Sequence, residues 1–505
     1  MAKRCIRLIK KFWLDGLCLF LLLSLSWYAW RMLPQGILRG NGFMYMLSRV
    51  QEWFWTRPYT LTGFETAAAI SGAVFRNFFG ANIGLYFWSE LFAILTIAAC
   101  FYGVVRILTK HRLVAFAASL IFTVNYFGNF DMLVAACYCY PMERVFTVPL
   151  LLLSFIFLLL FLERTGHKYY LVSLFLYFLG VGLAHFSFFF TAPFLLFPFF
   201  WHVYHKKRKT VGRGALIGIS YAAITVFFVL VQQINESGLG PAWSLGEFFF
   251  HPQKYHYIES IIAELTYWSQ YPPIFFPFIQ RVVFHYQTNR LLHTFLTVPN
   301  AREISPYVVS TYIIAAMVIY KKLSQQCAML LTIICSTGII FFLNAYFGQY
   351  LIASQSGSNR YLYFSTFLLA IFWSFFLWAV FWQKGSRIAI WGIVLLLGYF
   401  FINETLLSDN FREVQEWNES TKIVLGYIVH ARPYLTSNTL VIGPHPEIGT
   451  QESEFLTEQI GKGGVVYLSE SEDVNTLKET ASKSAQVIKL RYDKKCRCVH
   501  EEKIK

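Results

Sequence analysis

Long apolar runs separated by short polar links dominate the chain up to Asn403. A helix that crosses a bilayer needs about 20 mainly apolar residues, and in lipid such runs satisfy their backbone amides as helices. We therefore predict an all-α polytopic membrane protein with about eleven transmembrane helices. The candidate runs are 13–32, 83–105, 113–128, 142–162, 169–185, 187–204, 214–233, 304–320, 326–345, 361–382 and 388–402.

The pattern changes near Asn403, after which helix-like and strand-like segments alternate. This alternation is typical of a small parallel α/β layer. We predict a transmembrane domain over 1–403 and a small C-terminal α/β domain over 404–505. The expected helices lie around 410–431, 452–461 and 473–483, and the expected strands are 439–443, 464–468 and 486–490.

Composition supports the membrane assignment. Hydrophobic residues make up 56% of the chain and charged residues only 14%, whereas soluble proteins are about a quarter charged. The net charge is +15, yet residues 403–505 hold 16 of the 28 acids and only 13 of the 43 lysines and arginines. The basic excess therefore belongs to the apolar part, where it sits in short links, as in cytoplasmic loops. No nucleic-acid partner is expected.

The distribution of basic residues predicts the orientation. Six short links hold 19 basic residues, and four much longer segments on the opposite side hold 11. The positive-inside rule places the short links and the N-terminus in the cytoplasm. An odd number of spans then exports the C-terminal domain from a plasma (inner) membrane. The basic links are 1–13, 106–112, 163–168, 205–213, 321–322 and 384–387, and the outer segments are 31–82, 129–144, 234–303 and 346–360.

The outer segments 41–79 and 241–300 are long and rich in Trp, Tyr, Phe and His. Such residues favour the headgroup zone, so we predict interfacial helices in these loops. An ordinary extracellular cap is the alternative, but it would be more polar. Interfacial helices indicate contact with membrane lipids and a site that handles an amphiphilic substrate.

The nine cysteines do not form a recognisable disulfide framework, because their number is odd and many lie inside apolar runs. Two pairs, Cys137 with Cys139 and Cys496 with Cys498, lack a neighbouring set of ligands with zinc spacing. We interpret both pairs as adventitious thiols, and the metal ligands of the protein stay unknown.

Acidic residues are scarce before Asn403, so candidates for acid–base chemistry are few. Asp131 and Glu143 bracket the short second outer loop, and Arg144 follows at the mouth of the next span. An unpaired charge at that depth costs several kcal/mol. Glu143 and Arg144 either serve the substrate or pair with other groups and anchor helix packing.

Arg360 is the only charge between two late spans, and Tyr361 and Tyr363 follow it. A guanidinium binds phosphate through two parallel hydrogen bonds, whereas the alternative is an interfacial arginine–tyrosine anchor. His185 lies in the tight turn between 169–185 and 187–204. A single histidine there is more often a hydrogen-bonded helix cap than a base.

Two segments resemble the C-type membrane glycosyltransferase superfamily, which includes protein O-mannosyltransferases and lipid A aminoarabinose transferases. Residues 68–122, from AAISGAVFRNFFG to LVAFAASLIF, look like that family's block of interfacial helix followed by two spans. SNRYLYFSTFLLA at 358–370 is similar to its late Arg-Tyr-Leu-Tyr segment. The order of parts over most of 13–403 also resembles these proteins.

The resemblance implies transfer of a sugar from a polyprenyl-phosphate donor at the outer face, with a carboxylate shortly after the first span. That carboxylate activates the acceptor or holds a metal against the leaving phosphate. Here the corresponding stretch carries Asn41, and Glu52 is the first acid. Either an acid of a later segment substitutes, or the protein is a non-catalytic relative. The candidate acids are Glu52, Glu65, Asp131 and Glu143.

Our hypothesis is a membrane glycosyltransferase that acts on a cell-envelope acceptor, which is a glycan, a lipid or a protein. Asp131, Glu143, Glu52 and Glu65 are its candidate catalytic residues. Its candidate substrate-binding residues are Arg144, Arg360, Tyr361, Tyr363 and His185. These residues identify no cofactor with certainty, and a divalent metal ion stays open.

Two rival functions stay open. An O-antigen-type polysaccharide polymerase or ligase would use Arg281, Arg290 and Arg302 and an oligosaccharide diphosphate donor. A transporter would place ionisable residues at mid-membrane and use broken helices, and charges within the apolar runs are nearly absent.

Overall fold

The computed structural model is mostly helical. It describes residues 2–33, 83–125, 141–164, 166–183, 190–205, 211–235, 298–346, 363–383, 386–431, 435, 438–444, 453, 456–457 and 464–505.

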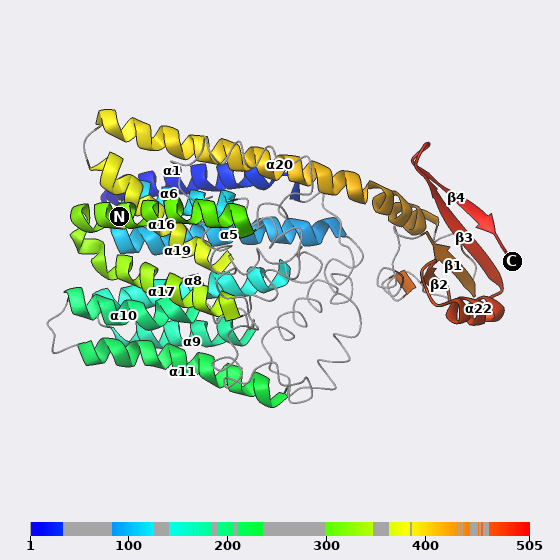
Figure 1. Ribbon diagram of the computed structural model, residues 1–505, viewed down its shortest axis with the longest axis horizontal. Helices are drawn as coiled ribbons and strands as arrows, with labels where there is room; N and C mark the ends of the chain where they lie inside the picture. The colour runs from blue at the N-terminus through cyan, green and yellow to red at the C-terminus, as the bar shows by residue number, and fades with distance from the viewer. Residues whose placement is uncertain are drawn as a thin grey trace.

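Each of the eleven predicted apolar runs overlaps a helix of the described chain. Figure 1 shows these helices running along a common direction, with the C-terminal sheet beyond one end of the bundle. The helices are α1 (Ala2–Trp30), α5 (Ile83–Thr109), α6 (Arg112–Val124), α8 (Pro141–Arg164), α9 (His167–Leu183), α10 (Thr191–His205), α11 (Val211–Asn235), α16 (Val298–Lys322), α17 (Cys327–Tyr346), α19 (Tyr363–Leu377), which continues as the π-helical η9 (Trp378–Trp382), and α20 (Ser386–Ala431).

Fewer than eleven of these helices meet the requirements of a membrane span on their own. Among the described residues, five are long and apolar enough to cross a bilayer, and a sixth candidate is a pair of helices bent by 112°. The prediction of eleven spans is therefore not confirmed, although several helices suited to a membrane are present. The reason is length, since α6 has only 13 residues and a full span needs about 20. The five stretches are Trp13–Trp30, Trp88–Thr109, Thr147–Arg164, Val211–Phe228 and Ile388–Thr405, and the bent pair is Pro306–Lys322 with Ser324–Ile340.

The short helix α6 lies at the centre of the packing. It contacts α1, α5, α19 and α20, and ten of its 13 residues are buried. Phe122 near its end stacks on Phe367 of α19 with ring centroids 3.8 Å apart. Phe101 of α5 meets both rings edge-on, at 5.5 and 5.3 Å. A helix enclosed on so many sides needs no polar face, which is why its composition reads like that of a lipid-facing span.

The C-terminal domain carries a four-stranded sheet of order β2-β1-β3-β4. Its first three strands run parallel, as predicted, and β4 pairs antiparallel with β3. The predicted helix at 473–483 is α22, which Asp473 caps by accepting hydrogen bonds from the amides of Asn475 and Thr476. The sequence did not predict β4, because its residues are mostly polar and exposed. The elements are β1 (Thr439–Gly443), β2 (Val466–Ser469), α22 (Val474–Lys483), β3 (Gln486–Asp493) and β4 (Cys498–Lys503).

Helix α20 is one continuous helix of 46 residues, where the sequence predicted two helices with a domain boundary at 403–404. The boundary therefore falls inside a helix. Residues 403–411 contain no Gly or Pro, and Leu407 and Phe411 are buried at 0% and 2% exposure. The apolar face thus continues past the predicted boundary, and Phe411 packs edge-on against Trp30 of α1 at 5.9 Å.

Candidate functional site

Most of the residues predicted to act on a substrate lie outside the described part of the chain. These are Glu52, Glu65, Asp131, His185, Arg360 and Tyr361, together with Arg281 and Arg290 of the rival hypothesis. For four more residues, including Arg302 of the rival hypothesis in α16, the backbone alone is described. Glu143 and Arg144 lie in the first turn of α8, and Tyr363 is the first residue of α19. The structure therefore describes the ends of the helices that lead into the segments holding these residues.

Three of those helix ends meet at one point, which we call the phenylalanine junction: Phe122, Phe190 and Phe367. Phe122 is in the last turn of α6, Phe190 directly precedes α10, and Phe367 is in the second turn of α19. Phe367 lies 3.8 Å from Phe122 and 5.3 Å from Phe190, measured between ring centroids. Aromatic pairs at such distances contribute about 0.5–1.5 kcal/mol beyond the area that they bury.

The phenylalanine junction limits how far apart three predicted residues can lie. Asp131 follows Phe122 by nine positions, His185 precedes Phe190 by five, and Arg360 precedes Phe367 by seven. A fully extended chain spans at most about 3.6 Å per residue. Each residue is therefore tethered within roughly 32 Å of a common point. The packing of the three helix ends therefore allows Asp131, His185 and Arg360 to lie close together. The sequence alone does not reveal this packing, because the three segments are far apart along the chain.

An ion pair lies at the same end of the bundle, directly after α1. Arg31 Nη1 donates to Glu404 Oε1 of α20 at 2.8 Å, and its guanidinium lies 4.0 Å over the ring of Tyr28. Ser408 Oγ donates to the same carboxylate oxygen at 2.9 Å. The Glu404 side chain is only 12% exposed, so the pair is more than a surface contact. Sequence reasoning missed it, because it assigned Glu404 to the soluble domain.

Buried hydrogen bonds connect this end of α1, α6 and α20. Asn125 is fully buried and donates from Nδ2 to the Tyr399 hydroxyl at 2.6 Å. Trp30 Nε1 donates to the carbonyl oxygen of Thr123 at 2.8 Å. Interhelical hydrogen bonds of this kind each contribute about 0.6 kcal/mol in a membrane. Their role is to fix the three helix ends relative to one another.

The opposite end of the bundle holds a second polar cluster, centred on Asp15. Its carboxylate accepts hydrogen bonds from Tyr102 Oη at 2.9 Å, Arg106 Nε at 2.7 Å and Arg112 Nε at 3.0 Å. The three donors come from α5 and α6, so the cluster ties both helices to α1. The carboxylate thus accepts hydrogen bonds from two guanidinium groups and a phenol, all three of which belong to neighbouring helices. We assign Asp15 a structural role.

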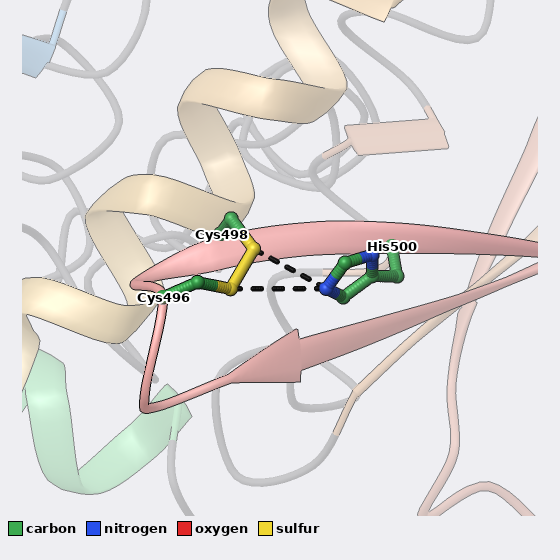
Figure 2. A group of neighbouring side chains, drawn as sticks. All are labelled: Cys496, Cys498 and His500. Carbon is green, nitrogen blue, oxygen red and sulfur yellow. Dashed lines mark hydrogen bonds between the residues drawn. A yellow bond between two sulfur atoms is a disulfide. The ribbon is translucent and has the colours of Figure 1, made fainter.

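A third group lies in the C-terminal domain, in the hairpin that joins β3 and β4. Cys496 and Cys498 form a disulfide, and His500 Nε2 lies 3.7 and 3.2 Å from their sulfurs (Figure 2). Among the described residues this is the one group of three side chains that could hold a metal ion. For Cys496 and Cys498, the interpretation as adventitious thiols without a neighbouring ligand is therefore wrong, whereas Cys137 and Cys139 lie outside the described residues. The overlooked signal was Cys-x-Cys-x-His, since alternate residues of a strand share one face.

No family model matches the chain, and no curated protein matches it. The resemblance of 68–122 and 358–370 to the C-type glycosyltransferases therefore stays an expectation.

Proposed function

We propose that this protein is a membrane glycosyltransferase, which moves a sugar from a polyprenyl-phosphate donor to a cell-envelope acceptor at the non-cytoplasmic face. The observation that carries the proposal is the phenylalanine junction. Through it, the helix ends that lead to Asp131, His185 and Arg360 are packed together at one end of the bundle. A lipid-linked donor presents its phosphate at that depth, and a sparse set of acids and arginines from separate segments would have to converge to use it.

The chemistry requires few groups. A carboxylate, Glu143 or Asp131, takes the proton of the acceptor hydroxyl as its oxygen attacks the anomeric carbon. The bond between that carbon and the phosphate oxygen breaks, and polyprenyl phosphate leaves with the electron pair. Arg144 and Arg360 stabilise the charge on the leaving phosphate. A divalent metal ion held by the acids would serve the same purpose, and Glu52 and Glu65 are the remaining candidate acids.

The experiment uses the purified full chain in lipid nanodiscs and follows release of polyprenyl phosphate from a panel of polyprenyl-phosphate sugars. Glu143→Gln and Arg360→Ala are expected to reduce release at least 100-fold, as loss of a general base or phosphate ligand does. Glu163→Gln is the matched control. Glu163 pairs with Lys110 at 2.6 Å at the opposite end of the bundle, so release is expected to stay unchanged.

Three outcomes contradict parts of the proposal. Full activity of both variants removes Glu143 and Arg360 from the reaction. A second panel holds polyprenyl diphosphate-linked oligosaccharides, and release of polyprenyl diphosphate from this panel alone favours the polymerase or ligase alternative. Failure of every donor in the panel, with a folded protein, favours the non-catalytic relative. A chelator added to the active protein tests the divalent metal ion separately.

A further inference from the structure

The β3–β4 hairpin places three ligand atoms on one small surface. The Cys496 and Cys498 sulfurs and His500 Nε2 all lie within 4.8 Å of one another. Cys498 and His500 are alternate residues of β4 and therefore point to the same face of the strand, and Cys496 reaches that face from the turn (Figure 2). The imidazole nitrogen is directed at both sulfurs. The disulfide is one chemical state of this group, and the dithiol is the other.

We propose that the dithiol form of this hairpin binds one thiophilic divalent cation of the zinc type, through Cys496 Sγ, Cys498 Sγ and His500 Nε2, and that the disulfide form does not. Soft thiolates together with an imidazole are the ligands that such cations prefer. A fourth position faces solvent, since Cys496 is exposed, and water or a small anion completes the tetrahedron.

The interatomic distances fit this coordination. Zinc lies about 2.3 Å from thiolate sulfur and about 2.0 Å from imidazole nitrogen, so a tetrahedral site separates sulfur from nitrogen by roughly 3.6 Å. The observed separations of 3.7 and 3.2 Å bracket this value. Only the two sulfurs must move apart, to roughly 3.8 Å. The proposal assigns this separation to rotation of the two cysteine side chains.

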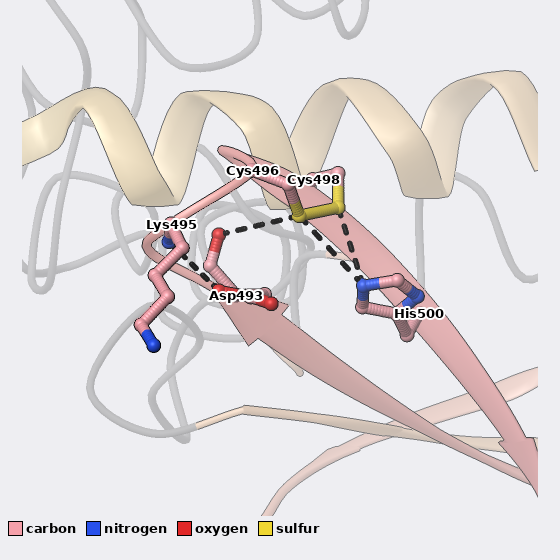
Figure 3. The surroundings of a disulfide bond; sticks show 5 residues. All are labelled: Asp493, Lys495, Cys496, Cys498 and His500. Atoms are coloured by element: carbon pink, nitrogen blue, oxygen red, sulfur yellow. Dashed lines mark hydrogen bonds between the residues drawn. A yellow bond between two sulfur atoms is a disulfide. The ribbon is translucent and has the colours of Figure 1, made fainter.

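The hairpin is held in place by contacts outside the ligand set. Arg497, between the two cysteines, donates from Nη1 to Glu419 Oε1 of α20 at 2.9 Å. The Lys495 amide donates to Asp493 Oδ1 at 2.7 Å and closes the turn (Figure 3). Fixed ligands lose little entropy when a metal binds. The ion pair also offsets the positive charge of Arg497, which would otherwise oppose a cation.

The redox step balances as follows. A dithiol or phosphine reductant supplies two electrons, two protons are taken up, and the Cys496–Cys498 bond becomes two thiols. Metal binding then displaces the two thiol protons, because the thiolate is the ligand. Reoxidation by a disulfide oxidant removes two electrons, reforms the sulfur–sulfur bond and releases the metal.

The test uses the full chain in nanodiscs, reduced with a phosphine under anaerobic conditions. Cobalt(II) is the probe, because its absorption reports tetrahedral thiolate coordination. One equivalent is expected to bind to the reduced protein, to be displaced by zinc, and to be absent from the disulfide form. His500→Gln is expected to weaken binding at least tenfold, and Cys496→Ser to abolish the thiolate signal.

Cys335→Ser is the matched control, since Cys335 is a free thiol in α17, and it should bind like the unchanged protein. Thermal unfolding verifies that each variant is folded. Two results overturn the proposal. One is a reduced protein that binds no cobalt although alkylation shows both hairpin thiols free. The other is one-equivalent binding that survives Cys496→Ser and Cys498→Ser together.

Discussion

Among the described glycines, Gly218 is the one where an added methyl group would come closest to a neighbouring helix, and we predict a large effect of adding it. Gly218 of α11 faces α10, where a Cβ at this position would lie 2.2 Å from the carbonyl oxygen of Leu195. Gly214, one turn earlier, comes similarly close to Pro198, with its added Cβ 2.6 Å from the carbonyl oxygen. Small residues four positions apart let two membrane helices pack backbone against backbone.

The cost of Gly218→Ala follows from these distances. An ordinary contact of carbon with oxygen is roughly 3.4 Å, so α11 must move away from α10 by about 1 Å. Overpacking costs about 1–3 kcal/mol, and the upper value applies because both partners are backbone. Alanine returns about 0.8–1.0 kcal/mol of helix propensity. The net loss is therefore about 2 kcal/mol.

The free energy of unfolding can be measured in mixed micelles by titrating a denaturing detergent and following tryptophan fluorescence. Gly338→Ala in α17 is the matched control, because no described atom lies within 4 Å of its added Cβ. We expect this variant to be as stable as the unchanged protein, or more stable by up to about 1 kcal/mol. Equal stability of the two variants would refute the close approach of α10 and α11.

Three further predictions use the same preparation. Asp15→Asn should lower the free energy of unfolding by about 2–3 kcal/mol, since it leaves guanidinium groups without their charged acceptor, whereas Glu163→Gln at an exposed pair should change it by less than 1 kcal/mol. Burial and a neighbouring arginine lower the pKa of His111. The neutral imidazole therefore stabilises the fold above its ordinary pKa of about 6.5, and this contribution is lost as pH falls below that value. His111→Gln should make the thermal unfolding temperature less dependent on pH between pH 7.5 and pH 5. Spin labels at Ile390 and Lys422 should give a narrow distance distribution near 48 Å, or about 1.5 Å per residue, and a broad one would contradict a continuous α20.

Helix positions were predictable from the sequence, because an apolar run in lipid must satisfy its backbone hydrogen bonds internally and does so as a helix. The run at 169–185 became α9 at His167–Leu183, for example. The number of spans was not predictable in this way. Helix α6, which lies in the predicted run 113–128, has 13 residues and is enclosed by other helices. Hydropathy does not distinguish a side chain buried in protein from one facing lipid.

Contacts between distant parts of the chain were beyond sequence reasoning. Asp15 meets donors 87–97 positions away, and Glu404 meets Arg31 across 373 positions, so no local pattern reveals either cluster. The group of Cys496, Cys498 and His500 was not predicted for another reason. Cys498 and His500 share a face only if their segment is a strand, and CVHEEK lacks the apolar alternation that predicts one. Residues 498–503 form a strand through antiparallel pairing with β3, which their own sequence does not indicate.

The continuity of α20 changes how the two ends of the protein relate. Its apolar stretch ends at Thr405, so the 26 residues that follow extend it by about 39 Å. Glu404 near the start of that extension pairs with Arg31, and Glu419 farther along pairs with Arg497 of the hairpin. One continuous helix therefore runs from the bundle to the sheet, with an ion pair to each of them (Figure 1). The residues proposed to bind the metal, Cys496, Cys498 and His500, are not among those proposed for sugar transfer. The redox and metal chemistry of the hairpin therefore requires no residue of the proposed transfer site. Loss of metal binding at the hairpin would therefore not contradict sugar transfer, and loss of sugar transfer would not contradict metal binding.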